Sequence, residues 1–235
     1  MNVVSIMAHQ DDEMQCLGTL LRCRARGDRL AFVTLTDGSR GFVQQPEIDP
    51  SEAARIRQTE MDELASRLDA HYINLREPDE FLYDTPPVRL ALIEAIRQTR
   101  ADLIFTHFHE DYNLDHTTVC AVVRHCAMQA CLPVLPTSSP PLEEHPAIFM
   151  VAPHGPVLFP ASHFVDISQV EDEKVALMAC HRSQEEAMRQ AVGAGFDRLC
   201  RRLDRYWGQA VGCDYAEAFV PQRGRGAIKP YNVLP

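Results

Sequence analysis

The sequence lacks several features that define whole classes of proteins. It has no apolar run of 18 residues, which disfavours a membrane span, and no basic N-terminal stretch followed by an apolar core, which disfavours a signal peptide. It also lacks a Lys/Arg-rich stripe, and its formal net charge is −10. Because such a charge repels polyanions, we expect neither nucleic acid nor a membrane as partner, and we expect a cytoplasmic protein.

Paired cysteines, linkers and repeats are absent as well. The eight cysteines include no C-x-x-C pair, which argues against a structural zinc knuckle and favours reduced thiols. No Gly/Ser-rich or charged linker divides the 235 residues, and apolar residues make up 46% of them. We therefore predict one globular domain over residues 1–235, with its core in about 1–220 and a C-terminal tail at 221–235.

Short apolar, β-branched runs alternate with segments of helical periodicity. This alternation predicts a Rossmann-like α/β fold, a mostly parallel sheet with helices on both faces. The predicted strands are Val3–Ala8, Leu30–Thr36, His71–Leu75, Asp102–Phe108 and Ile148–Val151, followed by a strand-like segment at 156–167.

The helical segments and one long loop complete this pattern. One helix is predicted to begin at a capping Ser51, another after Pro87, and a third to run from about Thr117 to Cys131 with Asp115 as its cap. Residues 171–205 are predicted to be helical, with interruptions at Gly193 and Gly195. The proline-rich stretch 133–146 is predicted to be a loop, either a lid or a surface connection.

Polar clusters follow three of the predicted strands. They occupy residues 9–13, 37–41 and 107–116. Because functional groups of an open parallel sheet collect at the carboxyl ends of its strands, these clusters are expected to converge on one edge.

The residue types at this edge suit a catalytic metal, which needs three His or Asp/Glu ligands and an open position. His9 and Asp12 can supply two ligands from one tight turn, and His116 is the best candidate for the third. Asp11 is then spare and can take a proton from water activated by the cation. On the residues alone, the alternative that Asp11 and Asp12 cap the following helix stays open.

Several ordered motifs resemble those of one known family. AHQDDE is similar to the AHPDDE signature of the PIG-L (LmbE-like) N-deacetylases, zinc-dependent hydrolases that remove acetyl groups from N-acetylglucosamine-type sugars and related amides. Further segments that resemble the family are LTDGSRG, IRQTE, THFHEDYNLDHTTV, VDISQVEDEKVALMACHRSQ and YAEAF. The likeness extends from about Met7 to Phe219 and implies a Rossmann-like fold, in agreement with the strand and helix pattern.

The resemblance also implies roles for single residues. It makes His9, Asp12 and His116 the zinc ligands and Asp11 the general base. Arg57 would hold substrate hydroxyl, carboxylate or phosphate groups. Asp115 would orient a neighbouring imidazole, as residues behind metal ligands commonly do.

The sequence departs from the family pattern at three positions. Gln10 replaces the usual proline and supplies an amide that could donate to substrate, and Gly18 is single where paired glycines are usual. Asn113 occupies the place of a histidine that the family is thought to use for the oxyanion or the leaving amine. Asn113 can donate a neutral hydrogen bond to the oxyanion but cannot deliver a proton.

Other polar residues near these motifs have more than one possible assignment. Because Asn113 cannot deliver a proton, the leaving amine would receive its proton from His109, Asp111 or Asp11. His107 and His109 are expected to face the same side of a strand, with one of them functional. His181, in HRSQ, is expected behind the metal ligands or at the substrate, and Arg40 is either a substrate contact or a solvated charge.

The leading hypothesis is a zinc-dependent hydrolase that removes an N-acetyl group from an amino sugar or a sugar-containing metabolite. A small-molecule substrate is expected, a homo-oligomer is compatible with the sequence without being indicated by it, and Fe²⁺ is an alternative metal. One alternative function is a non-haem iron(II) oxygenase, which also uses two histidines and one carboxylate. The other is a metal- or carbohydrate-binding domain without catalysis, suggested by Asn113.

Overall fold

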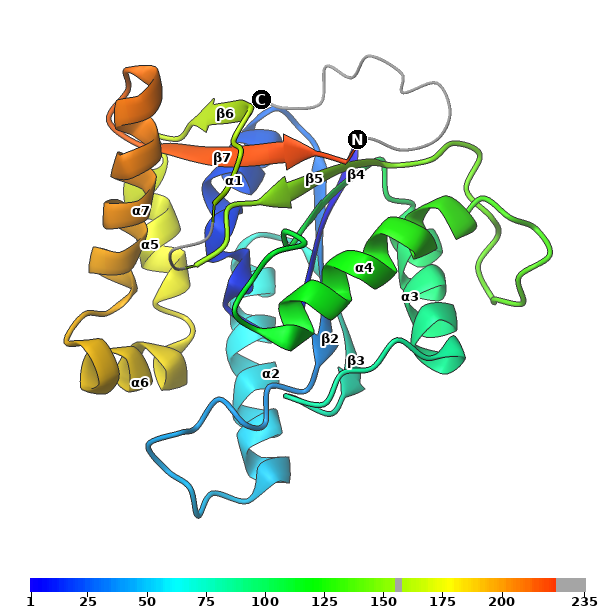
Figure 1. Ribbon diagram of the computed structural model, residues 1–235, viewed down its shortest axis with the longest axis horizontal. Coiled ribbons are helices and arrows are strands. Elements are labelled where there is room, and N and C mark those ends of the chain that lie inside the picture. The colour runs from blue at the N-terminus through cyan, green and yellow to red at the C-terminus, as the bar shows by residue number, and fades with distance from the viewer. Residues whose placement is uncertain (155–157, 223–235) are drawn as a thin grey trace.

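A computed structural model describes residues 1–154 and 158–222 of the chain, and in this part seven strands form one sheet (Figure 1). The strand order is β3-β2-β1-β4-β5-β7-β6. The strands are β1 (Asn2–Met7), β2 (Arg29–Thr36), β3 (His71–Glu77), β4 (Leu103–Thr106), β5 (Ala147–Val151), β6 (His163–Asp166) and β7 (Ala216–Pro221). Strands β1 to β5 are parallel, whereas β7 runs antiparallel to both β5 and β6.

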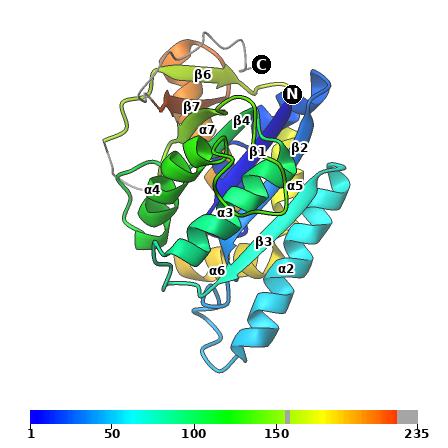
Figure 2. The same cartoon turned by 90° about the vertical axis from the view of Figure 1, so that its right-hand side faces the viewer.

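Helices cover both faces of this sheet (Figure 2). The helices are α1 (Leu17–Ala25), α2 (Pro50–Arg67), α3 (Pro86–Thr99), α4 (Leu114–Gln129), α5 (Glu171–Met178), α6 (Arg182–Val192) and α7 (Phe196–Val211), and a short 3₁₀ turn, η1 (Asp12–Gln15), precedes α1. Helices α3 and α4 pack on one face, and α1, α2, α5 and α7 on the other. Within the described residues, no helix is long and apolar enough to cross a membrane.

The apolar core is divided by the sheet into two clusters. One contains side chains of α1, α2, α5 and α7, including Leu17, Leu64 and Phe196, against one face of the strands. The other contains side chains of α3 and α4, including Leu92 and Val119, against the opposite face. Strands β1, β2, β4 and β5 are therefore buried on both sides, which explains why their sequences are mostly apolar rather than alternating, whereas the edge strands β3 and β6 are only partly buried.

The predicted α/β class with a mostly parallel sheet is confirmed, and the five predicted parallel strands exist with small shifts at their ends. Strand β4 is shorter than predicted, because it ends at Thr106. The strand-like segment at 156–167 contains only β6, and its first two residues lie outside the described residues. Strand β7, formed by part of the YAEAF segment, was not predicted as a strand. Residues 223–235 of the predicted tail are outside the described part.

The helix caps differ from those predicted. Asp49, and not Ser51, caps α2, since its side chain accepts from two backbone N–H groups and Pro50 occupies the first helical position. Asn113, and not Asp115, caps α4. In both cases an Asx residue that precedes the predicted start takes the cap, because its short side chain reaches the free N–H groups of the first turn.

The proline-rich loop at 133–146 lies away from the predicted functional edge. It follows the C-terminus of α4, and β5 then begins where the Ala147 N–H donates to the carbonyl oxygen of Asp102, at the amino end of β4. The buried guanidinium of Arg97 donates to three backbone carbonyl groups at or near the start of this loop. The loop is therefore a surface connection at the amino edge, and its interpretation as a lid is wrong.

Candidate metal centre

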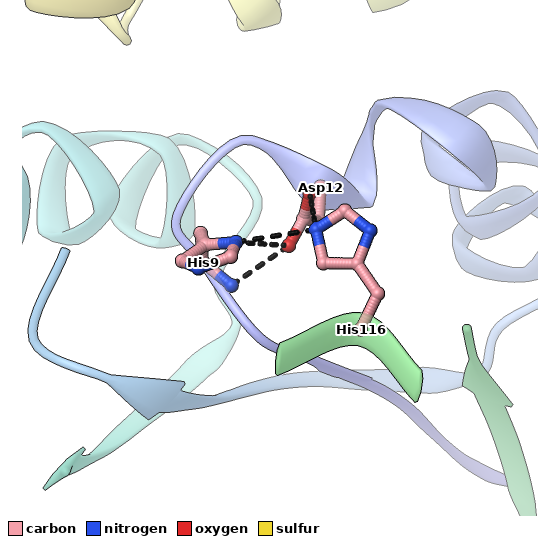
Figure 3. A group of neighbouring side chains, drawn as sticks. All are labelled: His9, Asp12 and His116. Atoms are coloured by element: carbon pink, nitrogen blue, oxygen red, sulfur yellow. Dashed lines mark hydrogen bonds and ion pairs between the residues drawn. The ribbon is translucent and has the colours of Figure 1, made fainter. Parts of the chain in front are cut away.

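The predicted ligands come together at the carboxyl edge of the sheet. His9 and Asp12 follow β1, and His116 lies in the first turn of α4, after β4 (Figure 3). His9 Nδ1 lies 3.2 Å from Asp12 Oδ2 and 3.3 Å from His116 Nε2, and His116 Nε2 lies 3.4 Å from Asp12 Oδ1. One potential ligand atom from each residue lies within 4.8 Å of the others, as a single cation would require.

Carboxylates behind the two imidazoles fix which ring nitrogen can bind a metal. Asp79 Oδ1 lies 3.0 Å from His9 Nε2, and Asp111 Oδ2 lies 3.1 Å from His116 Nδ1. Because each carboxylate favours an N–H on the nitrogen it faces, the lone pairs of His9 Nδ1 and His116 Nε2 are left to converge beside Asp12. Three electron-pair donors at this spacing suit a divalent cation with an open position.

The charges around this cluster also favour a cation. Burial lowers the pKa of His116, but Asp12 and Asp111 outweigh it and raise this pKa to about 9. Burial raises the pKa of Asp12, but His116 and His107 outweigh that effect and hold it well below its usual range. Without a metal, the protonated His116 is therefore the positive partner of the Asp12 carboxylate, and a bound cation would displace that proton and take over this role.

His107 lies beneath the cluster rather than in it. Its Nε2 accepts the Ala8 N–H at 2.9 Å, and its ring stacks on that of His116 with centroids 4.0 Å apart. Burial, together with the charge of His116, lowers the pKa of His107 to about 4, so the ring is neutral near pH 7. The side chain therefore supports the position of His116 without offering a free lone pair.

Asp11 has a backbone conformation that non-glycine residues rarely adopt, with φ of 120°. Its N–H donates to Glu13 Oε2 at 3.0 Å. The Arg57 guanidinium donates to the carbonyl of Gln10 and to Asp11 Oδ1, the latter at 3.1 Å. Strain held by surrounding contacts is common at functional sites, and here it separates the directions of two adjacent carboxylates.

The hypothesis that Asp11 and Asp12 cap the following helix is wrong. Neither carboxylate makes a side-chain cap for η1 or α1. The first turn of α1 is capped from β7, because Glu217 accepts the N–H groups of Gly18 and Thr19 at 2.8 and 2.7 Å. Asp12 Oδ2 instead accepts the N–H of His9 at 2.7 Å, which closes the ligand turn.

The HRSQ segment connects the start of α6 to the candidate site. His181 is fully buried, with Nε2 2.5 Å from Glu13 Oε1, and Glu13 in turn accepts the N–H of Asp11. Ser183 donates to Glu60 of the IRQTE segment through both its N–H and its hydroxyl, each at 2.7 Å. Gln184 Nε2 donates to the Gly41 carbonyl at 3.2 Å. These contacts join segments that resemble the family into one scaffold behind the metal cluster.

Asn113 has an orientation set by its helix cap. Its Oδ1 accepts the N–H groups of Asp115 and His116 at 2.8 and 3.4 Å. The Nδ2 group is therefore the part of the amide left for a ligand, and Asn113 lines the cavity beside the cluster. An amide donor in this position can stabilise negative charge on a carbonyl oxygen.

The cluster opens into a cavity of about 420 Å³, a volume suited to a small molecule. Among the residues that line it are Asp11, Arg57, Tyr112, Asn113, His154 and Gln184. Arg57 is 2% exposed, and its Nε and Nη1 are buried without a hydrogen-bond partner among the described residues. Buried guanidinium donors without partners indicate that this wall would bind hydroxyl or anionic groups.

Some predicted site residues do not reach this cavity. Gln10 is fully buried and donates to the Thr36 carbonyl at 3.3 Å, so its prediction as a substrate contact is wrong. The Oε1 atom of Gln10 occupies the space that a Cβ on residue 38 would need. Gly38 also has a positive φ of +68°, so the lack of space and the backbone conformation each require glycine at this position. His109 is half exposed and lines another cavity, so it does not lie behind the ligands as predicted.

Of two other predicted residues, Arg40 lines the cavity and Asp115 is buried behind His9. Arg40 lines it with the guanidinium carbon 5.0 Å above the ring centre of Phe81, at an exposed position. Asp115 Oδ2 lies 3.5 Å from His9 Nε2, farther than Asp79 Oδ1. Both Asp115 oxygens also accept backbone N–H groups, those of Glu80 and Leu82, so this residue mainly holds the loop after β3.

Sequence reasoning missed Asp79, Tyr112 and His154. Asp79 follows β3 and His154 follows β5, so the carboxyl-edge rule that located the other clusters could have found them. Tyr112 lies within the predicted 107–116 cluster, and its ring centre is 6.1 Å from that of His116. Burial lowers the pKa of His154, which therefore faces the cavity as a neutral imidazole near pH 7.

The fold and the cluster together define an α/β protein with a two-histidine, one-carboxylate site at the carboxyl edge of a parallel sheet. A family model described as PIG-L, GlcNAc-PI de-N-acetylase, matches residues 4–127, just over half of the chain. The chain belongs to the PIG-L family.

Solved structures of similar fold cover nearly the whole chain. The conserved protein TT1542 from Thermus thermophilus is 28% identical, with 97% of each chain covered and a TM-score of 0.78. N,N'-diacetylchitobiose deacetylase from Pyrococcus horikoshii is 21% identical, with 94% of this chain and 83% of that chain covered and a TM-score of 0.80. GalB, the 4-carboxy-2-hydroxymuconate hydratase from Pseudomonas putida KT2440, is 20% identical, with coverage of 98% and 100% and a TM-score of 0.79. The last two likenesses show the fold alone, and this fold serves more than one reaction.

Proposed function

We propose that the chain is a zinc-dependent N-deacetylase that removes the acetyl group from an amino sugar or a sugar-containing metabolite. The observation that carries the proposal is the convergence of His9 Nδ1, His116 Nε2 and Asp12 in the wall of a cavity. Asp11, which is not one of the candidate metal ligands, lines the same cavity. Membership of the PIG-L family supports the reaction class. His9, Asp12 and His116 would hold the metal, which when bound polarises the amide carbonyl and acidifies water.

The residues around the cluster can perform the other parts of amide hydrolysis. Asp11 accepts the proton of the attacking water, and Arg57 keeps Asp11 oriented by donating to its Oδ1 at 3.1 Å. Asn113 Nδ2 donates to the carbonyl oxygen as negative charge develops there. The remaining Arg57 donors bind hydroxyl or anionic groups of the sugar and hold the acyl group at the cluster.

The leaving amine requires a proton, and Asp11 is the residue best placed to return it. His109 is excluded by its position outside the cavity, and Asp111 contacts His116 Nδ1 instead. His154 has a lowered pKa and therefore carries no spare proton near pH 7. Asp11 gains a proton in the first step, so one carboxylate serves as base and then as acid.

The test combines metal analysis with acetate release from N-acetylated sugars, beginning with N-acetylglucosamine and N,N'-diacetylchitobiose. We expect one zinc per chain and acetate release by the wild type. Asp11→Asn should retain the metal and lose at least 10²-fold in kcat, because the amide cannot accept the proton. A chain that binds zinc but releases no acetate from any acylated sugar would contradict the proposal.

The two alternative functions give different results in the same experiment. An oxygenase would need Fe²⁺ and a 2-oxo acid, and would consume oxygen without releasing acetate. A binding domain would retain its affinity for sugars in the Asp11→Asn variant and would show no turnover in the wild type.

A further inference from the structure

A second cavity, of about 460 Å³, lies along α7 and has arginine as its main polar residue. Arg198, Arg201, Arg202 and Arg205 all line it, at a spacing of i, i+3, i+4 and i+7 that places them on one side of the helix. This concentration of positive charge stands out in a chain whose formal net charge is −10. Among the described residues that line this wall, Asp197 is the one acidic side chain, and Arg189 lies 3.3 Å from its Oδ1.

Two of these arginines are fixed by neighbouring side chains. Arg205 donates to the Tyr215 hydroxyl at 2.8 Å, and its guanidinium carbon lies 5.2 Å from the centre of the Tyr215 ring. Arg201 donates to Asp172 at 2.6 Å, and its guanidinium carbon lies 5.9 Å from the centre of the same Tyr215 ring. Fixed guanidinium groups lose little conformational entropy on binding an anion.

The other two arginines have no competing partner. The guanidinium groups of Arg198 and Arg202 make no hydrogen bond or ion pair within residues 1–154 and 158–222. Both residues are exposed, so they can turn toward a ligand in the cavity. Two fixed and two free guanidinium groups form an arrangement suited to a carboxylate or phosphate group, which arginine binds through paired N–H donors.

The arginine-lined cavity adjoins the candidate catalytic cavity. Val192, the last residue of α6, and Leu199, in the first turn of α7, belong to the walls of both. Helix α7 follows α6 after a short connection (Figure 1). A ligand whose acyl group lies at the metal cluster could therefore extend past these two side chains. The second cavity therefore adjoins the first along these two side chains.

We propose that the cavity along α7 is a specificity subsite that binds a carboxylate- or phosphate-bearing portion of the acylated substrate. The identity of the ligand, an acylated substrate, rests on the proposed deacetylase function. The ability of the cavity to bind an anion is independent of that function. Such a subsite selects substrates that are anionic at a distance from the acetamido group and discriminates against neutral sugars.

The test measures binding in an Asp11→Asn background, where turnover is blocked. Isothermal titration with pyrophosphate, citrate, N-acetylglucosamine 1-phosphate and N-acetylglucosamine is compared for this protein and for a further Arg198→Gln/Arg202→Gln variant. We expect the added double substitution to weaken binding of the anionic ligands at least tenfold and to leave neutral N-acetylglucosamine unchanged. Pyrophosphate and citrate separately report phosphate and carboxylate binding, and both should weaken as salt rises.

A matched control removes the same charge elsewhere. Arg55→Gln/Arg67→Gln lies on the exposed side of α2 and should not alter any of these affinities. Equal losses in both double variants, or no binding of either pyrophosphate or citrate, would overturn the subsite. Arginine-dependent anion binding together with no acetate release by the wild type would retain the anion site and overturn the deacetylase proposal, so the two failures are distinguishable.

Discussion

At the residue scale, the charge state of Asp11 depends on its contact with Arg57. Burial raises the pKa of Asp11, and the Arg57 guanidinium opposes that effect by stabilising the carboxylate. Both groups are well buried, so solvent screens their interaction only weakly. A general base works only when ionised, and activity is therefore lost as the pH falls through the pKa of Asp11.

We predict that Arg57→Met moves the acidic limb of the kcat/KM profile to higher pH by about one unit or more, because it removes the charge that lowers the Asp11 pKa. Arg57→Lys keeps a positive charge and should move the limb less, although both variants lose substrate contacts. Profiles measured between pH 4 and 9 separate the two effects. An acidic limb at the same pH in all three proteins would show that Asp11 is not the titrating base.

Asp79 provides a second prediction at this scale. Its Oδ1 lies 3.0 Å from His9 Nε2 and favours the tautomer whose Nδ1 lone pair faces Asp12. Asp79→Asn should weaken metal affinity by about 10–100-fold, as the loss of such supporting carboxylates commonly does. Competition with a chelator measures this change. Asp62→Asn removes the same charge from an exposed position on α2 and should leave affinity unaltered; equal affinities in all three proteins would contradict the orienting role.

At the scale of single elements, α4 connects helix capping to the candidate chemistry. Asn113 caps the helix whose first turn carries His116, and the same cap directs the amide nitrogen away from the helix. One residue therefore has a stabilising and a chemical contribution, which can be separated because serine also caps helices but has no amide.

We predict that Asn113→Ala lowers the free energy of unfolding by about 1 kcal/mol, whereas Asn113→Ser lowers it by only a few tenths. Both variants should lose about 10²–10³-fold in kcat, since both lack the donor to the developing oxyanion. Denaturant unfolding and acetate release measure the two quantities. Full activity in the serine variant would show that the amide contributes only as a cap.

The elements also show why part of the site could be predicted and part could not. The strand pattern and the carboxyl-edge rule are local in sequence, and they located His9, Asp12 and His116 from the sequence alone. The partners of these residues are set by packing between distant segments. The carboxyl-edge rule can place Asp79, which follows β3, at this edge of the sheet, but it does not predict that Asp79 contacts His9. Glu217 caps α1 from β7, a contact that no local pattern encodes. Gln10 was misassigned because the family proline it replaces does not reveal which way a longer side chain points.

At the scale of the whole molecule, one buried ion network joins four elements behind the sheet. Lys174 of α5 is fully buried and donates to Asp204 of α7 at 2.6 Å and to Glu217 of β7 at 2.8 Å. Glu217 also accepts the first N–H groups of α1. Lys174 and Glu217 belong to two of the segments that resemble the family, so these two residues act in the scaffold, whereas Gln184 of the same late segment lines the candidate catalytic cavity.

We predict that Lys174→Met lowers the free energy of unfolding by about 3–5 kcal/mol, because it leaves two carboxylates buried without a positive partner. Arg67→Gln, which breaks an exposed ion pair with Glu63, should cost less than about 1 kcal/mol. Denaturant unfolding of the two variants provides the comparison. Adding Asp204→Asn to Lys174→Met should recover part of the lost free energy of unfolding, because it removes one of the uncompensated charges. Such a recovery would show that the stability depends on the balance of charges in the network and not on the lysine side chain alone. A Lys174→Met protein as stable as the wild type would show that the network is not needed to hold α1, α5, α7 and β7 together.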